Sequence, residues 1–219
     1  MKARAVARRP REVRATRDVI LDAAERRFAE RGFSGVSVRE IAADAGLKNQ
    51  ASLYHHFKNK KALYEAVLQR GLEPIIELVA GSSTAGDRSD PVLDRIVDHL
   101  AAHPHLPRLI QRAGLDDSKA LRGTVGRLLS PLYSSGLRVL AGGGGLWSDE
   151  EIPHLAAGLY HLIFGYFANA ALLEAVLPDD PSSPAALARQ AQFLKVAVAR
   201  LLGGEAVPAR AARGPRKIP

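Results

Sequence analysis

Apolar residues recur along most of this chain at intervals of three and four, the spacing that places them on one face of an α-helix. Ile20, Ala24 and Phe28 form the first such stripe, and Gly32 is suited to end the helix that carries it. This pattern predicts a helix over residues 16 to 31. No segment alternates strictly between apolar and polar residues as a half-buried strand does. The sequence therefore predicts an all-α fold.

Two shorter helices are predicted next. The segment "SVREIAADAG" begins with Ser37, has Glu40 three residues later as in a capping box, and closes with Gly46. The segment "KNQASLYHHF" follows, and a further helix is predicted to begin near Asn59. Two short helices around a glycine-containing turn are typical of a helix-turn-helix, here the end of a three-helix N-terminal domain.

The rest of the chain reads as a helical bundle. We predict helices over residues 91–100, 109–116, 121–140, 150–177 and 184–202, with "HPHLP" at residues 103–107 as a break. The apolar run over residues 156–176 approaches the length of a membrane span, but His161, Asn169 and Glu174 interrupt it. We therefore interpret it as a buried helix of a soluble protein with no membrane partner.

Charge is distributed unevenly. Residues 1–72 carry 16 Lys and Arg against 8 Asp and Glu, residues 73–205 carry 11 against 15, and residues 206–219 carry 4 against none. A basic module at one end of a chain is typical of a protein that binds a polyanion such as nucleic acid or an anionic membrane. The absence of Cys excludes disulfide frameworks, thiolate zinc sites and a cysteine nucleophile.

The segment around residue 50 has the side chains that a DNA-reading helix needs. Asn49, Gln50 and Ser52 suit hydrogen bonds to base edges. Cations, hydroxyls and a histidine around them suit phosphate contacts. These phosphate candidates are Lys48, Tyr54, His55, Lys58 and Lys60. The alternative interpretation of the same residues is a solvated basic face on a helical bundle.

The segment "TRDVILDAAERRFAERGFSGVSVREIAADAGLKNQASLYHHFKNKKALYEAVL", residues 16–68, resembles the DNA-binding domain of the TetR family of bacterial transcriptional regulators. "ILDAAERRFAERGF" is similar to that family's first helix, "SVREIAADAG" to its second, "SLYHHF" to the end of its recognition helix and "KNKKAL" to the start of its fourth. Between Gly46 and Tyr54 this chain has one residue more than the commonest form. Any of the four residues 48–51 is therefore a candidate for the start of the recognition helix.

The resemblance implies further roles in the N-terminal part. Arg39 would reach a base or phosphate from the second helix, and Lys60 would meet the DNA backbone. Arg14 and Arg17 belong to a basic arm that would enter the minor groove or track phosphates, unless the arm is only a disordered leader. Leu53, Phe57, Ile41, Phe28 and Leu63 would form the core of the small domain. The expected divisions are an arm over residues 1–15, a DNA-binding domain over 16–71, a ligand-binding and dimerisation domain over 72–204, and a flexible basic tail over 205–219.

The resemblance also implies a dimer and a small-molecule pocket. The last two helices would pair with those of a second copy, with small residues permitting close approach: Gly158, Gly165, Ala168 and Ala171. Candidates for the pocket lining, each of which is equally suited to core packing or the dimer contact, are Leu109, Ile110, Leu128, Leu132, Tyr133, Tyr160 and Phe164. The prolines near His99, His103 and His105 disturb any metal geometry, and we predict no metal site there.

We therefore expect a cytoplasmic, dimeric repressor that binds a palindromic operator and is released by an unidentified small molecule, with no other cofactor. An activator has the same sequence signature. The alternatives are a small-molecule binding or scaffold protein whose helix-turn-helix reads no specific DNA, and a protein that coats DNA non-specifically. We do not expect an enzyme, because "AGGGGL" follows a predicted helix and lacks the phosphate-loop lysine, and no G-x-S-x-G motif occurs.

Overall fold

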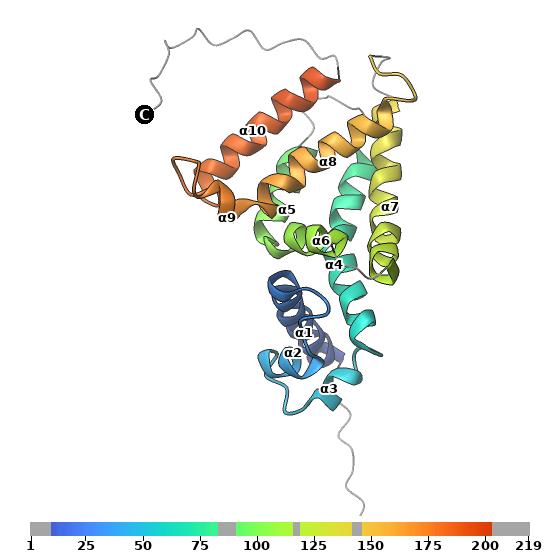
Figure 1. The fold of residues 1–219 in the computed structure, drawn as a ribbon, viewed down its shortest axis with the longest axis vertical. Coiled ribbons are helices and arrows are strands. Elements are labelled where there is room, and N and C mark those ends of the chain that lie inside the picture. Colours follow the sequence, from blue (N-terminus) through green and yellow to red (C-terminus); the bar gives the residue numbers. More distant parts are fainter. Residues whose placement is uncertain (1–9, 83–90, 116–118, 142–145, 203–219) are drawn as a thin grey trace, which may run out of the picture.

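A computed structural model describes residues 10–82, 91–115, 119–141 and 146–202, and every regular element within these ranges is a helix (Figure 1). The helices, in chain order, are α1 (Pro10–Arg31), α2 (Val38–Asp44), α3 (Gln50–Tyr54), α4 (Lys60–Gly81), α5 (Val92–Ala102), α6 (His105–Leu115), α7 (Lys119–Ala141), α8 (Ile152–Ala168), α9 (Ala170–Leu173) and α10 (Pro184–Leu201). The all-α prediction is confirmed.

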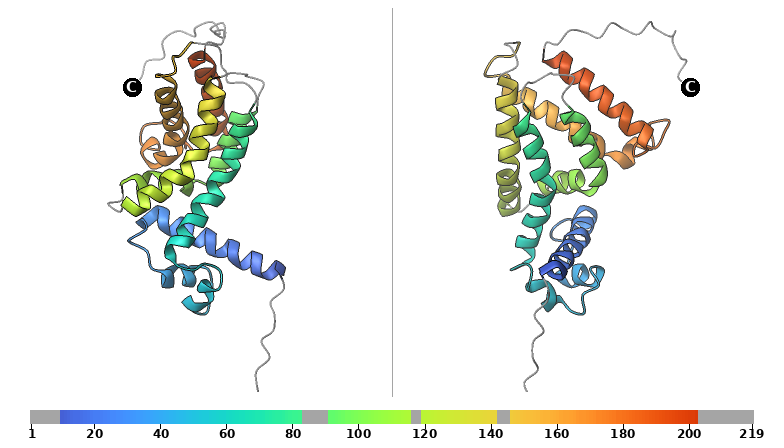
Figure 2. Two further views of the ribbon diagram at one scale, coloured as in Figure 1. Left: turned by 90° about the vertical axis from the view of Figure 1, so that its right-hand side faces the viewer. Right: turned by 180° about the vertical axis from the view of Figure 1, so that it is seen from behind.

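The molecule is elongated, with α1, α2 and α3 at one end and the bundle of α5 to α10 at the other (Figure 1). Helix α4 begins beside α3 and runs into the bundle, so it belongs to both parts (Figure 2). Within the bundle α7 lies along α4, α10 packs on α5, and α6 lies between α1 and α8. The predicted tail over residues 205–219 and the first nine residues of the predicted arm lie outside the described residues.

The first helix is longer than predicted. It begins at Pro10 instead of residue 16, so the last part of the expected arm is helical and Arg14 lies within α1. Proline is well suited to the first turn of a helix, because an amide hydrogen there has no partner within the helix. The other end agrees with the prediction: α1 stops at Arg31, and Gly32 follows with a φ of +73°, a conformation that favours glycine.

The core of the small domain is confirmed. Phe28, Ile41, Leu53 and Leu63 are fully buried, and Phe57 is nearly so. Its apolar cluster continues along α4 into the bundle without a break. The two parts of the molecule therefore share one continuous hydrophobic core, which permits packing changes in one part to be felt in the other.

The long helix predicted over residues 150–177 is instead divided. Helix α8 ends at Ala168, and the single turn of α9 follows Asn169. The Asn169 side-chain amide donates a hydrogen bond to the Gly165 carbonyl, with 2.9 Å between the atoms. Such a local side-chain bond competes with the helical backbone and explains the interruption. Among the described residues, no helix has the length and apolar character needed to cross a membrane.

Candidate nucleic-acid interface and apolar cavity

Helix α2 begins with the capping box that the sequence predicts. The Ser37 hydroxyl accepts from the Glu40 amide at 3.2 Å, and the Glu40 carboxylate accepts from the Ser37 amide at 2.8 Å. The hydrogen bond from the Ser37 backbone amide, with further contributions from the Ser37 side chain and the Arg31 guanidinium, lowers the pKa of the Glu40 carboxyl from 4.5 to about 2. Arg39 stands in this first turn with an exposed side chain.

The start of α3, which the sequence leaves open, is defined by its cap. Asn49 has an extended backbone, and its side-chain oxygen accepts from the Ser52 amide at 3.0 Å and lies 3.3 Å from the Ser52 hydroxyl. Asn49 is therefore the N-cap, and Gln50 is the first helical residue. The Asn49 oxygen is engaged by Ser52, whereas Gln50 and Ala51 are exposed on the first turn.

Ion pairs hold α2 against α1. The Arg27 guanidinium bonds both carboxylate oxygens of Asp44, at 2.5 and 2.8 Å, and Arg31 pairs with Glu40. The hydrogen bonds from Arg27 hold the pKa of Asp44 below its usual range. Leu53, fully buried, anchors α3 on the same core. The bidentate Arg27–Asp44 ion pair positions α2, and the buried side chain of Leu53 positions α3, so the loops alone do not set the arrangement of these two helices.

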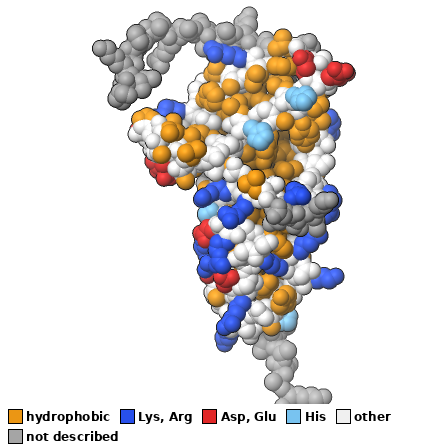
Figure 3. Space-filling view, viewed as in Figure 1, with side chains coloured by type: hydrophobic (Ala, Val, Ile, Leu, Met, Phe, Trp, Pro, Cys, Tyr) orange, Lys and Arg blue, Asp and Glu red, His pale blue; other side chains and the backbone are white. Residues whose placement is uncertain are grey.

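The predicted DNA contacts gather at the end of the molecule where α2 and α3 lie. Lys48, Gln50, Tyr54, His55 and Lys58 are exposed around α3. In the space-filling view this half of the molecule carries most of the visible Lys and Arg side chains, and the bundle half is largely hydrophobic (Figure 3). The charge asymmetry read from the sequence is thus also visible on the face of the molecule drawn in Figure 3.

Two predicted cations lie against aromatic rings at this end. The Lys60 ammonium lies 4.5 Å from the centroid of Phe33, and partial burial lowers the pKa of Lys60. The Arg17 guanidinium lies 5.1 Å from the centroid of Phe57, which brings the early part of α1 next to the turn between α3 and α4. Both contacts orient a cation with weak attraction and leave its charge available to a second partner. The side chain of Arg14 lies outside the described residues.

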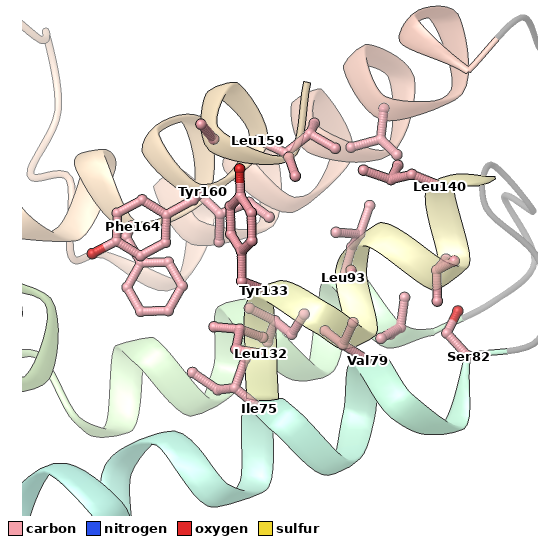
Figure 4. Close-up of a pocket in the computed structure, with 18 of the residues that line it drawn as sticks. Ile75, Val79, Ser82, Leu93, Leu132, Tyr133, Leu140, Leu159, Tyr160 and Phe164 are labelled. Carbon is pink, nitrogen blue, oxygen red and sulfur yellow. The ribbon is translucent and has the colours of Figure 1, made fainter. Parts of the chain in front are cut away.

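A cavity of about 310 Å³ that is partly open to solvent lies in the bundle, lined by residues of α4, α5, α7, α8 and α10 (Figure 4). Four of the predicted pocket residues line it: Leu132, Tyr133, Tyr160 and Phe164. Three do not. Leu109 and Ile110 are buried in α6, which faces α1 and α8, and Leu128 packs against the core. The sequence pattern identified α6 as apolar but could not say which neighbours its apolar face would meet.

Several lining residues were not predicted from the sequence, among them Ile75 and Val79 on α4, Leu93 on α5, and Lys195 and Val198 on α10. Ile75 and Val79 are four residues apart on one helical face, so their spacing was a usable signal. The other lining segments lie at very different distances along the sequence, from α5, which is the next helix after α4, to α10 near the end of the described residues. The sequence pattern did not pair those segments.

Helix α4 connects this cavity with the candidate nucleic-acid interface. Its N-terminal half contributes Leu63 and Val67 to the small domain's core, and its C-terminal half contributes Ile75 and Val79 to the cavity wall. Between them, the Gly71 carbonyl lies 2.8 Å from Nε2 of His99. His99 is therefore engaged with α4, a structural role for the first histidine of the cluster considered above.

Helix α6 makes a second connection. The Arg112 guanidinium donates to the Glu30 carbonyl at 2.9 Å, near the C-terminal end of α1. A cation at this position also interacts favourably with the α1 dipole. Movement of α6 would therefore be transmitted directly to α1.

The small residues predicted for a dimer contact lie on α8 and α9. Gly158 and Ala171 are exposed, and Gly165 and Ala168 are half-buried. A Cβ atom placed on either glycine would meet no other atom within 4 Å. Large apolar side chains are exposed nearby, with Leu172 65% exposed. Figure 3 shows hydrophobic side chains spread over the half of the molecule where α8 and α10 lie in Figure 1. Small residues and an uncovered apolar face are typical of a helix-to-helix interface.

Residues 20–67 match the family model described as bacterial regulatory proteins, tetR family. The chain is 32% identical over 106 residues to the HTH-type transcriptional repressor SCO4008 of Streptomyces coelicolor, covering 48% of this chain and 53% of that protein. It is 42% identical over 64 residues to the HTH-type transcriptional repressor KstR2 of Mycolicibacterium smegmatis, covering 29% of this chain and 31% of that protein. The chain thus spans about half, or less, of the length of these curated relatives.

Solved structures share the fold over a greater length. The structure of the transcriptional regulator FadR from Bacillus subtilis in complex with stearoyl-CoA has a TM-score of 0.61 at 18% identity, covering 81% of this chain and 96% of that one. At this identity the likeness concerns the arrangement of helices. It confirms that the bundle and the small domain occur together in one fold.

Proposed function

We propose that this chain, whose residues 20–67 match the model of the tetR family of bacterial regulatory proteins, is a dimeric transcriptional repressor that a small molecule releases from a palindromic operator. The observation that carries the proposal is the short helix α3, which presents Gln50 on an exposed first turn among cationic side chains. The other end of the same molecule holds an apolar cavity. Such a repressor would act in the cytoplasm, where bacterial DNA is found.

Base recognition is assigned chiefly to Gln50. The side-chain oxygen of a glutamine accepts from the N6–H₂ group of adenine and its NH₂ group donates to adenine N7, so glutamine pairs with adenine through two hydrogen bonds in the major groove. Asn49 and Ser52 are partly engaged in capping α3, which leaves the Asn49 amide nitrogen and the Ser52 oxygen for further base contacts. The Ala51 methyl group, exposed beside Gln50, suits the methyl group of thymine.

Phosphate contacts are assigned to the residues around this turn. Lys48, Tyr54, His55 and Lys58 flank α3 with exposed side chains, and Lys60 opens α4. The same role is proposed for Arg39, which is exposed on α2, for Arg17, which is exposed on α1, and for Arg14 by its position in α1. These contacts set the register of α3 in the groove and supply most of the affinity that depends on salt.

Dimerisation follows from the geometry of operators. Two recognition helices must lie about one turn of DNA apart, ~34 Å, to read the two halves of a palindrome. The face that carries Gly158, Gly165 and Ala171 is the proposed contact with the second copy. Burying its exposed apolar side chains would supply the driving force.

The cavity is the proposed effector site, and α4 is the proposed link to the DNA. An effector that fits the cavity better in one arrangement of α4 shifts the population toward that arrangement and away from the spacing that DNA requires. A coupling of ~1–3 kcal/mol changes operator affinity by roughly 5- to 150-fold. The stearoyl-CoA complex of the Bacillus subtilis regulator supports the view that this fold accommodates a ligand with a long apolar chain.

Matched variants test the assigned roles on duplexes selected by the native protein from a random library. Gln50→Ala should lower discrimination between selected and scrambled duplexes by about 1–3 kcal/mol. Lys60→Ala should weaken both duplexes alike and reduce the salt slope by about 1. Arg95→Ala removes the same charge from an exposed position on α5 and should change neither property.

Failure of the library to yield any preferred duplex would favour the alternative, a small-molecule binding or scaffold protein whose helix-turn-helix reads no specific DNA. If Gln50→Ala loses the same binding affinity for selected and scrambled duplexes, Gln50 contributes to affinity without distinguishing one base sequence from another. Either result would overturn the proposed role of Gln50.

A further inference from the structure

The cavity wall offers few polar atoms to a ligand. Most lining side chains are aliphatic or aromatic, and those with polar side-chain atoms are Ser82, Tyr133, Tyr160, His161 and Lys195. The Tyr133 hydroxyl already donates to the Pro153 carbonyl at 2.5 Å, and in Figure 4 it points toward the neighbouring helix. A ligand in this cavity would therefore gain most of its affinity from apolar contact.

The cation in the wall is neutralised by the protein itself. The Lys195 ammonium on α10 lies 2.6 Å from a carboxylate oxygen of Asp94 on α5, and the two side chains are 24% and 40% exposed. An anionic ligand would have to displace Asp94 or place a second negative charge beside it. Both arrangements leave one carboxylate without a cation in partly apolar surroundings, which is unfavourable. A cationic ligand meets the same difficulty with Lys195.

Tyr160 contributes a neutral polar group at one end of the cavity, beside Phe164 (Figure 4). Its ring stacks on Phe164 with 4.7 Å between centroids and meets His161 edge to face at 5.3 Å. Burial raises the pKa of Tyr160 to about 12, so its hydroxyl stays protonated at neutral pH and can donate or accept one hydrogen bond. A single oxygen on the ligand is enough to use it.

We propose that the effector of this protein is an uncharged, largely apolar molecule that carries one hydrogen-bonding oxygen, because the Lys195–Asp94 pair neutralises the one Lys, Arg, Asp or Glu side chain found among the described lining residues. The inference rests on the proposed function, which assigns the effector to this cavity. The volume of about 310 Å³ lies at the lower end of the range of roughly 300–1,000 Å³ typical of small-molecule pockets, so a small ligand such as a medium-chain alcohol fits.

Three probes with the same alkyl chain separate charge from apolar contact: decan-1-ol, decanoate and decylammonium. Each is titrated into the full-length protein by calorimetry at neutral pH, without DNA. We expect decan-1-ol to bind at least tenfold more tightly than either ion. Decanoate or decylammonium binding as tightly as the alcohol would overturn the proposal while leaving the effector role of the cavity intact.

Reciprocal variants test the cause of this preference. Asp94→Asn frees the Lys195 ammonium and should raise the affinity for decanoate at least tenfold, with decan-1-ol changed by less than twofold. Lys195→Met frees the Asp94 carboxylate and should raise the affinity for decylammonium instead. Asp98→Asn removes a charge from an exposed position one turn along α5, outside the cavity wall, and should leave the preference of the native protein unchanged. No gain of ion binding in either reciprocal variant contradicts the assignment.

Release of the protein from its operator, measured separately with each probe, distinguishes ligand binding by the cavity from regulation of DNA binding by that ligand. If decan-1-ol binds as expected but leaves the operator complex intact, the chemistry of the cavity stands and its proposed regulatory role fails. If none of the probes binds, the cavity is not a ligand site for molecules of this size, and the inference fails together with that part of the proposed function.

Discussion

Replacement of Gly71 by alanine tests the contact through which the bundle meets α4. A Cβ atom on Gly71 would lie 2.6 and 2.9 Å from the two terminal methyl carbons of Leu106 on α6, and 3.2 Å from its branching carbon. Carbon atoms in good contact lie about 3.5–4.0 Å apart. Leu106 is fully buried, so its side chain has no open space into which to turn.

The expected cost follows from two opposing effects. Overpacking of a buried site destabilises a protein by typically ~1–3 kcal/mol. Alanine in place of glycine in a helix returns ~0.5–1 kcal/mol. We therefore expect Gly71→Ala to lower the free energy of unfolding by about 0.5–2 kcal/mol, in urea titrations followed by circular dichroism at one fixed protein concentration.

Gly81→Ala is the matched control, since Gly81 lies on the same helix and a Cβ there meets no atom within 4 Å. It should cause no loss of stability. A double-mutant cycle with Leu106→Ala should show that the two substitutions at the contact are less harmful together than their sum, by ~1 kcal/mol or more. If Gly71→Ala is as stable as the native protein, or the cycle is additive, the close approach of α6 to α4 is not the tight contact described above.

Three further predictions follow from other contacts. Glu25→Gln should lower the free energy of unfolding, measured by urea titration, by about 2 kcal/mol. The reason is that the nearly buried Glu25 carboxylate accepts a hydrogen bond from Arg70 at 2.7 Å and so connects α1 with α4. The pKa of Glu40 is lowered from 4.5 to about 2 in the folded protein, so the stability that ionised Glu40 contributes is complete above pH 4.5 and is lost as the pH falls through 2. The melting temperatures of the native protein and of Glu40→Gln should therefore converge as the pH is lowered over that window. Melting temperatures that differ by the same amount at every pH would contradict this. Gly165→Leu should separate the proposed dimer in sedimentation without changing the fold of the protomer, because the added side chain meets open space; an unchanged dimer would move the interface elsewhere.

The features predicted most successfully from the sequence are those that depend on neighbouring residues. The capping box of Ser37 and Glu40 and the glycine that ends α1 require only a few consecutive positions, and the structure confirms both. The Asn49 cap has the same local character: an asparagine before the first outward polar turn is a standard N-cap signal, which would have identified the start of α3.

The features that sequence reasoning missed depend on distant segments. Helix α6 packs between α1 and α8 and does not line the cavity, so Leu109 and Ile110 are core residues. Lys195 and Asp94 lie on helices far apart in the chain, and their pairing sets the charge of the cavity. The break at Asn169 reflects a single side-chain bond that competes with an otherwise good helical pattern.

The measurement that tests the central claim most directly is fluorescence anisotropy of the full-length protein on labelled DNA from immediately upstream of its own gene, with a scrambled duplex as competitor at about physiological salt. We predict a preference of ~10³ or more for the native duplex, as expected of a sequence-specific regulator. Equal and weak binding to both duplexes would contradict the proposal that α3 reads an operator there.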